Sequence, residues 1–316
     1  MYRMKHTLIL VAAALVLAAC SQDEPTGDSL PVGEYPLLIN AAGLQVIATP
    51  QTRGTYDGNW DEVETVAVKV DGQVKSYKVK AETGSGSAYL SPAEPLGTGA
   101  GDLPFWWTST TQTKNITAWC PYSETEPIWG GSWSVKPNQS EGIPAEADIL
   151  YATRTITFGN EVFLQFGHLM AKVVINILAS DYLKNYSKED ISVTMNNMEC
   201  SGNFENDTYG GLSLIGNETN SETIIPHPCD VTESNHFASY EALIIPQHLI
   251  MSGKYIEVKV GSAVYRWDLS IPDLRFYSGS HYTYDITIKA AGLDVQVAQS
   301  TAWTNGDSGS GSVALP

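Results

Sequence analysis

The residue types that perform chemistry are present in this chain, but their spacing does not match a catalytic motif. Ser308 lies in Gly306-Asp307-Ser308-Gly309, which resembles the nucleophile turn of trypsin-like proteases. Serine becomes a nucleophile only beside a general base, and no strand that carries a histidine precedes this segment in a matching pattern. We therefore expect a flexible turn here.

A second set of side chains could bind a metal ion by type: Cys200, His227, Cys229 and His236. Their spacing fits no standard zinc site, and the prolines on both sides of His227 indicate a loop. His168 lies in an apolar strand run, where a core histidine is expected. The chain has no HExxH motif, P-loop or dinucleotide fingerprint. The sequence thus predicts no enzyme, no cofactor and no metal site.

The chain has four cysteines, of which Cys20 lies at the end of an N-terminal apolar run. The other three allow at most one disulfide in an oxidising compartment. Cys200 and Cys229 are the more plausible pair, because both fall in the second half of the chain, whereas Cys120 does not. Buried thiols are the open alternative.

The N-terminus has the pattern of an export signal. Arg3 and Lys5 precede the apolar run Leu8–Ala19, which is too short to span a membrane. The run ends in Leu17-Ala18-Ala19-Cys20, which resembles the lipobox of bacterial lipoproteins. That resemblance implies removal of residues 1–20 as a signal peptide, lipidation of Cys20, and an outer-membrane lipoprotein. An ordinary signal peptide with an incidental cysteine is the alternative.

The segment after Cys20 reads as a tether that faces the cell surface. Ser21-Gln22-Asp23-Glu24 resembles the surface-export signal of Bacteroidetes lipoproteins. Residues 21–36 are rich in Pro, Gly and acidic residues, which is typical of a flexible linker.

Composition supports a folded protein outside the cell. The chain has 316 residues, 43% of them hydrophobic, only 17% charged, and a net charge of −17. The hydrophobic content excludes wholesale disorder. The acidic balance argues against nucleic-acid binding, because a phosphate backbone would be repelled.

The elements needed to position any site are strands. Alternating apolar runs recur throughout, as in Val66–Val70 and Val74–Val79 around Asp71-Gly72, and in Tyr255–Val260 and Val264–Leu269 around Gly261-Ser262. Such turns between alternating runs predict hairpins. The best helix candidate is Ser180–Ile191. We therefore predict an all-β fold, with a boundary between two similar domains, 37–157 and 158–316.

A family resemblance is carried by motifs in the same order along the chain. With the lipobox, the chain resembles the Mfa-like fimbrillin family, the type V pilus subunits of Bacteroidales. The motifs are Thr52-Arg53 ahead of Trp60-Asp61, Asp148–Ala152, Phe166–Val173, Ala242–Gln247, Tyr265–Leu269, Phe276–Ile286, Gly292–Val295 and Trp303.

The resemblance implies two tandem transthyretin-like β-sandwich domains in a subunit of a surface fimbria. It also implies cleavage by an Arg-specific protease, which removes the first strand and opens a groove for a donor strand from a neighbouring subunit. We expect the cut between Arg53 and Gly54, although Arg53 also suits an ordinary loop. The strand to be displaced would carry alternating apolar residues, namely Leu38, Leu44, Val46 and Ala48.

The donor strand would come from the C-terminal part of the chain. Leu293, Val295 and Val297 alternate cleanly, and Ser312–Leu315 is a second, shorter candidate. Both also read as ordinary edge strands. A stalk subunit needs a free donor and a tip subunit does not, and we favour a tip or accessory subunit. The partners would be other fimbrial subunits, the outer membrane through Cys20, and a host or bacterial surface ligand.

A rival interpretation is a cell-surface lipoprotein that binds glycans. Five of the eight tryptophans lie between Phe105 and Trp133, and aromatic side chains with Asn and Gln can form a sugar platform. Core packing of these rings is the alternative. Loss of binding in Trp106→Ala or Trp133→Ala would support the rival interpretation.

Overall fold

The structure is a computed structural model that describes residues 28–42, 60, 63–82, 87–93, 104–128, 130–206, 212–217, 219–231, 233–249, 253–269 and 275–302. These residues form strands with three short 3₁₀ turns, so the all-β prediction is confirmed. The turns are η2 (Ala145–Ala147), η3 (Asp181–Leu183) and η4 (Lys188–Asp190).

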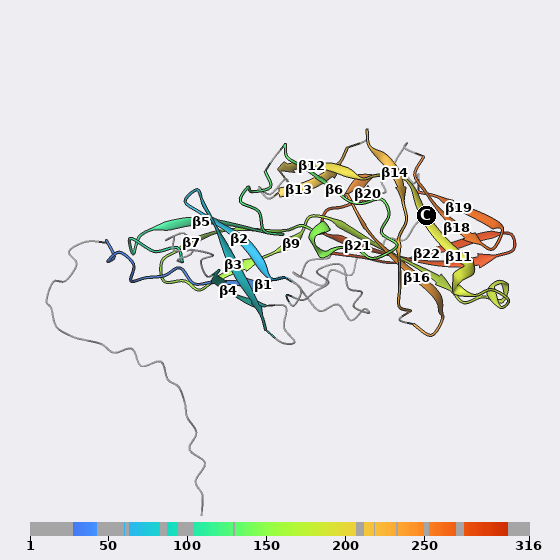
Figure 1. Cartoon of the computed structure of the whole chain (residues 1–316), viewed down its shortest axis with the longest axis horizontal. Coiled ribbons are helices and arrows are strands. Elements are labelled where there is room, and N and C mark those ends of the chain that lie inside the picture. The colour runs from blue at the N-terminus through green and yellow to red at the C-terminus, as the bar shows by residue number, and fades with distance from the viewer. Residues whose placement is uncertain are drawn as a thin grey trace, which may run out of the picture.

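An eight-stranded sheet forms one end of the molecule (Figure 1). Its order is β8 (Val162–Gln165), β1 (Ile39–Ala42), β4 (Ala88–Pro92), β3 (Gln73–Ala81), β2 (Thr65–Val70), β5 (Thr113–Cys120), β7 (Leu150–Thr157) and β9 (Gly167–His168). Only Phe166 separates the two terminal strands of this order, β8 and β9. The sheet therefore curls round until its two edges meet, and it encloses the first of two hydrophobic clusters.

A five-stranded and a four-stranded sheet form the other end of the molecule (Figure 1). The five-stranded sheet has the order β15 (His227–Cys229), β16 (His236–Ile244), β10 (Ala171–Leu178), β21 (Ser280–Lys289) and β22 (Gly292–Ala302). The four-stranded sheet has the order β14 (Ser221–Ile224), β11 (Ile191–Glu199), β18 (Tyr255–Val260) and β19 (Ala263–Asp268). Both sheets contribute buried side chains to the second cluster, as in a sandwich.

Two small sheets complete the fold. One has the order β13 (Leu212–Gly216), β12 (Ser201–Asn206) and β6 (Ser132–Ser134), and the other pairs β17 (Gln247–His248) with β20 (Arg275–Phe276). Leu214 of β13, Phe276 of β20 and Val135, which follows β6, belong to the second cluster.

Both predicted hairpins are present. β2 and β3 are joined by Asp71 and Gly72, whose φ angles of 51° and 81° are those of a type I′ turn. β18 and β19 are joined by Gly261 and Ser262, with a positive φ at Gly261. The local turn chemistry was sufficient for these two predictions.

The predicted helix over Ser180–Ile191 is wrong. The segment forms two separate 3₁₀ turns, η3 and η4. Ser187 and Asp190 form a reciprocal capping box, so a new turn, η4, begins after Ser187. In η3, Leu183 is the one buried side chain. One buried apolar side chain in that turn is too little to stabilise an isolated helix.

The two hydrophobic clusters do not divide the chain at residue 157. Val162 and Leu164 of β8 pack in the first cluster, whereas Val135 and Ile143 pack in the second. Residues that precede β8 in the chain therefore already belong to the second cluster, although β8 itself belongs to the first. The assignment of two domains, 37–157 and 158–316, stays a prediction.

Candidate functional site

Strand β1 is inserted between two strands that do not pair with each other. It pairs antiparallel with β4, from Ile39 opposite Leu90 to Ala41 opposite Ala88. On its other side it pairs parallel with β8, from Ile39 opposite Val162 to Ala42 opposite Gln165. Without β1, β4 and β8 would each present an unpaired edge on this side.

The side chains of β1 fill the first cluster. Leu37, Ile39 and Ala41 are buried, whereas Leu38 is 73% exposed. The alternation that we expected to run through Leu38 is therefore one residue out of phase, because the inward residues have odd numbers. The other members of that pattern, Leu44, Val46 and Ala48, lie outside the described residues, as do Arg53, Gly54 and Cys20.

The residues before β1 are also attached to the fold, and we call residues 28–37 the N-terminal arm. The arm runs beside residues 105–110, so residues 28–36 differ from the flexible tether that we expected. Four backbone hydrogen bonds join the two segments: Thr110 N–H to Asp28 O (2.7 Å), Leu30 N–H to Thr108 O (2.9 Å), Trp107 N–H to Tyr35 O (2.9 Å) and Leu37 N–H to Phe105 O (2.7 Å).

Aromatic side chains surround the arm and β1. Trp107 meets Phe158 edge to face at 5.7 Å between ring centroids, and Phe158 meets Tyr35 at 5.9 Å. Tyr77 stacks on Phe105 at 6.2 Å, and burial raises the pKa of Tyr77 to about 12. These contacts hold the two segments at the start of the first sheet.

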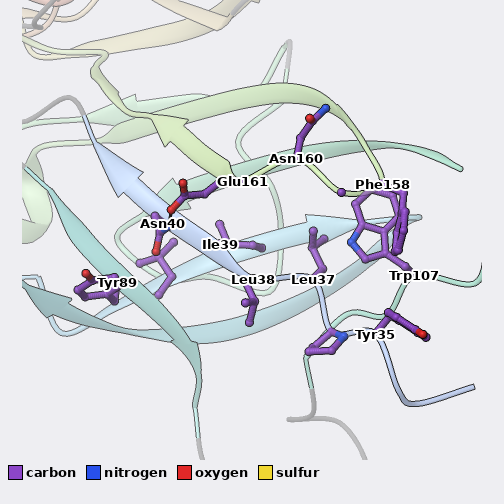
Figure 2. A pocket seen from close by; sticks show the side chains of 13 residues that line it. Tyr35, Leu37, Leu38, Ile39, Asn40, Tyr89, Trp107, Phe158, Asn160 and Glu161 are labelled. Carbon is purple, nitrogen blue, oxygen red and sulfur yellow. Dashed lines mark hydrogen bonds between the residues drawn. The ribbon is translucent and has the colours of Figure 1, made fainter. Parts of the chain in front are cut away.

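A hollow of about 620 Å³ lies beside the arm and β1 (Figure 2). Its lining consists of Tyr35, Pro36, Leu37, Leu38, Ile39, Asn40, Tyr89, Leu90, Trp107, Phe158, Gly159, Asn160 and Glu161. The N-terminal segment thus forms one wall, and β4, Trp107 and the connection between β7 and β8 form the others.

The candidate donor residues lie in β22. This strand pairs antiparallel with β21 from Lys289 opposite Gly292 to Ser280 opposite Ala302. Leu293 and Val295 pack against the second cluster. The side chain of Val297 and the segment Ser312–Leu315 are outside the described residues. In this chain, β22 is an edge strand of its own sheet.

The predicted disulfide between Cys200 and Cys229 is absent, and both residues are thiols. Cys200 is buried beside β11 and β12, whereas Cys229 lies in β15 of the five-stranded sheet. Burial raises the pKa of Cys200 to about 11 and that of Cys229 to about 12. Both thiols are therefore poor nucleophiles.

Three buried acid–base pairs lie in the interior of the described residues. His168 Nδ1 lies 2.7 Å from Asp148 Oδ2, Lys254 Nζ lies 2.7 Å from Glu199 Oε1, and Lys172 Nζ lies 2.9 Å from Glu241 Oε2. Among the described residues, no group of three His, Cys, Asp or Glu side chains could hold a metal ion. The pairs tie neighbouring strands together.

The tryptophans of the predicted sugar platform do not gather on one surface. Trp107 and Trp119 are buried, and Trp129 lies outside the described residues. Trp106 forms a bridge to Pro36 of the arm, whereas Trp133 lies in β6 and donates its indole N–H to Ala147 O at 2.9 Å. Core packing therefore explains this region better than a platform does.

The sequence reasoning missed the arm, Asn40 and the hollow. The only local signal for the arm is Leu30, Tyr35 and Leu37, apolar residues in a segment otherwise rich in Pro, Gly and acidic residues. Their partners, residues 105–110, lie about seventy positions away. No local pattern encodes such a pairing.

Two solved structures share this fold. One is a putative cell adhesion protein from Bacteroides ovatus, with a TM-score of 0.62, 16% identity, and coverage of 86% of this chain and 99% of that chain. The other is a putative cell adhesion protein from Bacteroides uniformis, with a TM-score of 0.59, 18% identity, and coverage of 87% and 100%. A search of curated proteins gave no match. These similarities define the class of fold.

The family follows from the sequence itself. The model of the family described as fimbrillin-like matches residues 52–303, which is most of the chain. The chain belongs to this fimbrillin-like family. Membership supports a fimbrial role at the cell surface, with other fimbrial subunits as partners, rather than an enzymatic role. Within the described part of the chain, we find no helix that is long and apolar enough to cross a membrane.

Proposed function

We propose that this protein is a fimbrial subunit that assembles by donor-strand exchange after its N-terminal segment is cut off. The observation that carries the proposal is the place of β1, between β4 and β8. Loss of β1 would leave two strand edges and an apolar slot previously filled by Leu37, Ile39 and Ala41. An extended segment from another subunit would satisfy both, with backbone hydrogen bonds and alternate side chains.

The proposed cut lies between Arg53 and Gly54, in the stretch that joins Ala42 to Trp60. The three arginines among the described residues lie in strands and are engaged there. Arg154 donates to Phe163 O at 2.6 Å, Arg266 pairs with Asp268, and Arg275 lies over the Tyr277 ring at 4.5 Å. Strands resist proteases better than exposed loops do, so these three arginines are poor sites for cleavage.

Cutting alone would not release the N-terminal segment. The arm would still hold its four backbone hydrogen bonds, and β1 its two ladders. An incoming strand would have to compete for both. In this proposal the uncut precursor is lipidated on Cys20 and exported to the outer membrane, and it remains monomeric until it is processed.

For the position in the fibre, we propose a tip or accessory subunit. Leu293 and Val295 already pack against their own second cluster. To act as a donor, β22 would have to leave β21 along its whole length. A tip subunit accepts a strand and does not give one, so it can keep β22 in place.

The test is digestion of the purified precursor with an Arg-specific protease. We expect a single cut after Arg53. A synthetic donor peptide from a stalk subunit should bind to the cut form and not to the uncut form. The matched control is Arg53→Lys, which keeps the charge and removes the site for this protease. Trypsin should cut that variant and restore binding.

The outcome that would overturn the proposal is equally defined. If the wild-type chain is cut after Arg53 and the N-terminal peptide is stripped in mild denaturant, an empty slot must accept a strand or lose solubility. A cut and stripped chain that remains monomeric, soluble and unable to bind any donor peptide contradicts strand exchange.

A further inference from the structure

The hollow beside the arm has the size and lining of a ligand site. Its volume of about 620 Å³ is within the usual range of small-molecule pockets, about 300–1,000 Å³. It is elongated, with Tyr35 at one end and Tyr89 at the other, and Leu38 between them (Figure 2). Both tyrosine side chains are largely open to solvent, at 41% and 55% exposed.

Four aromatic rings contribute to its walls. Phe158 stands edge to face against both Tyr35 and Trp107, so these three rings support one another. Tyr89 is supported separately, by a hydrogen bond to Glu82. The hollow therefore has a tyrosine ring at each end, and each ring contacts a neighbouring side chain before any ligand arrives.

The polar groups lie along one side. Asn40 Nδ2 donates to Glu161 Oε1 at 3.4 Å, and Asn160 Nδ2 donates to Thr157 Oγ1 at 2.7 Å. The residues that line the hollow include no Lys, Arg or His. With Glu161 in its lining and Glu82 beside Tyr89, the hollow would repel an anion.

We propose that this hollow binds a neutral oligosaccharide. A ligand that is wholly apolar would displace water from Asn40, Asn160 and Glu161 and would not satisfy the hydrogen-bonding groups that their contacts to each other and to Thr157 leave over, which is unfavourable. A small cation could contact only one end. Two separated tyrosine rings, with amides and a carboxylate in the lining between them, suit a ligand that repeats an apolar face and carries hydroxyl groups along its edge.

The position of the hollow links ligand binding to assembly. Residues 35–40, nearly half of its lining, precede Arg53 in the chain. If the N-terminal segment is cut and displaced, this wall leaves with it. The uncut subunit would then bind the oligosaccharide and the exchanged subunit would not. This last step rests on the proposed function, whereas the site itself does not.

The test uses the purified precursor on a microarray of neutral and sialylated oligosaccharides. We expect binding to neutral glycans that falls about tenfold in Tyr35→Ala and in Tyr89→Ala, a factor that corresponds to about 1.4 kcal/mol. The control is Tyr122→Ala, because Tyr122 is as exposed as Tyr35 and lies outside the hollow. Thermal unfolding of each variant shows whether it is folded.

Each contrary result has a defined meaning. Absence of binding to neutral glycans, stronger binding to sialylated ones, or an equal loss in Tyr122→Ala overturns the site. After digestion, a chain that has accepted a donor peptide and still binds the glycan also overturns it. A digested chain that accepts no donor and still binds the glycan contradicts strand exchange and leaves the site standing.

Discussion

The two hydrophobic clusters are stabilised in different ways. The first is completed by a strand from the N-terminus, and its interior is almost wholly apolar. The five-stranded and four-stranded sheets, which line the second cluster, carry several buried polar side chains, namely Lys172, Asn176, Glu199, Ser239 and Glu241. A strand held by apolar burial and backbone hydrogen bonds can be replaced by another of similar shape, whereas buried ion pairs fix particular partners. The first cluster therefore fits the proposed exchange of one strand for another, whereas the second cluster favours a fixed set of strands.

The largest expected effect is the loss of a buried ion pair beside the second cluster. Glu199→Ala leaves the ammonium group of Lys254 buried without its partner, and we expect a loss of about 3–5 kcal/mol in the free energy of unfolding. Chemical denaturation measures it. The control is Asp181→Ala, because the pair between Asp181 and Lys184 is exposed and should contribute less than about 1 kcal/mol.

A loss below about 1 kcal/mol for Glu199→Ala would contradict this difference between the clusters, because the buried pair of Lys254 and Glu199 would then contribute no more than an exposed one. A double variant, Glu199→Ala with Lys254→Met, tests whether the loss comes from the unpaired ammonium group. Removing both charges should recover much of the lost stability if the penalty comes from an unpaired ammonium.

The next effect tests the apolar slot in the first cluster. Ile39→Ala should cost about 2–5 kcal/mol, because the side chain is buried in that cluster. Leu38→Ala, one residue earlier on the exposed face, should stay within about 0.5 kcal/mol. Equal costs at both positions would show that the strand does not lie in the register described. Urea unfolding of the uncut precursor is the measurement.

That pair of positions also shows where sequence reasoning stops. Leu37, Leu38 and Ile39 are consecutive apolar residues, so alternation alone does not reveal which of them faces inward. The phase is set by β4 and β8, which pair with β1 across about 50 and 120 residues. The hairpins at Asp71-Gly72 and Gly261-Ser262 were predictable because the whole signal is local.

The site itself was predictable only in outline. The family resemblance placed an exchangeable strand near the N-terminus, and β1 lies there. The arm and the hollow depend on Phe105–Thr110 and on the connection between β7 and β8, so only the folded chain brings them together. Between the two alternatives left open for Cys200 and Cys229, the structure has free thiols; shared position in the second half of the chain says nothing about the distance between two Cβ atoms.

A smaller effect is the loss of stability at alkaline pH, to which a buried tyrosine in each cluster contributes. Burial raises the pKa of Tyr77 in the first cluster and of Tyr240 in the second to about 12, from the ordinary tyrosine value of about 10. The unfolded chain therefore loses these protons first as the pH rises. The stability that each phenol contributes is complete below about pH 10 and is lost between about pH 10 and 12.

We therefore expect the urea midpoint to fall between pH 8 and pH 11, and to fall less in Tyr77→Phe and in Tyr240→Phe. A fall that is unchanged in Tyr77→Phe but reduced in Tyr240→Phe would place alkaline sensitivity in the second cluster alone. The reverse would place it beside the N-terminal arm, where the Tyr77 hydroxyl accepts a hydrogen bond from Phe105 N–H.

The smallest effect concerns Cys200, a member of the second cluster, and Cys229, which lies in the five-stranded sheet that lines it. Because Cys200 and Cys229 are thiols, a reductant should leave the melting temperature unchanged. Both cysteine peptides should be alkylated after denaturation without prior reduction. In the folded chain at pH 8, alkylation of Cys229 should be slow, since a pKa of about 12 leaves very little thiolate. A melting temperature that falls with reductant would instead mean that the second cluster is held by a covalent bond, and its permanence would no longer depend on buried ion pairs.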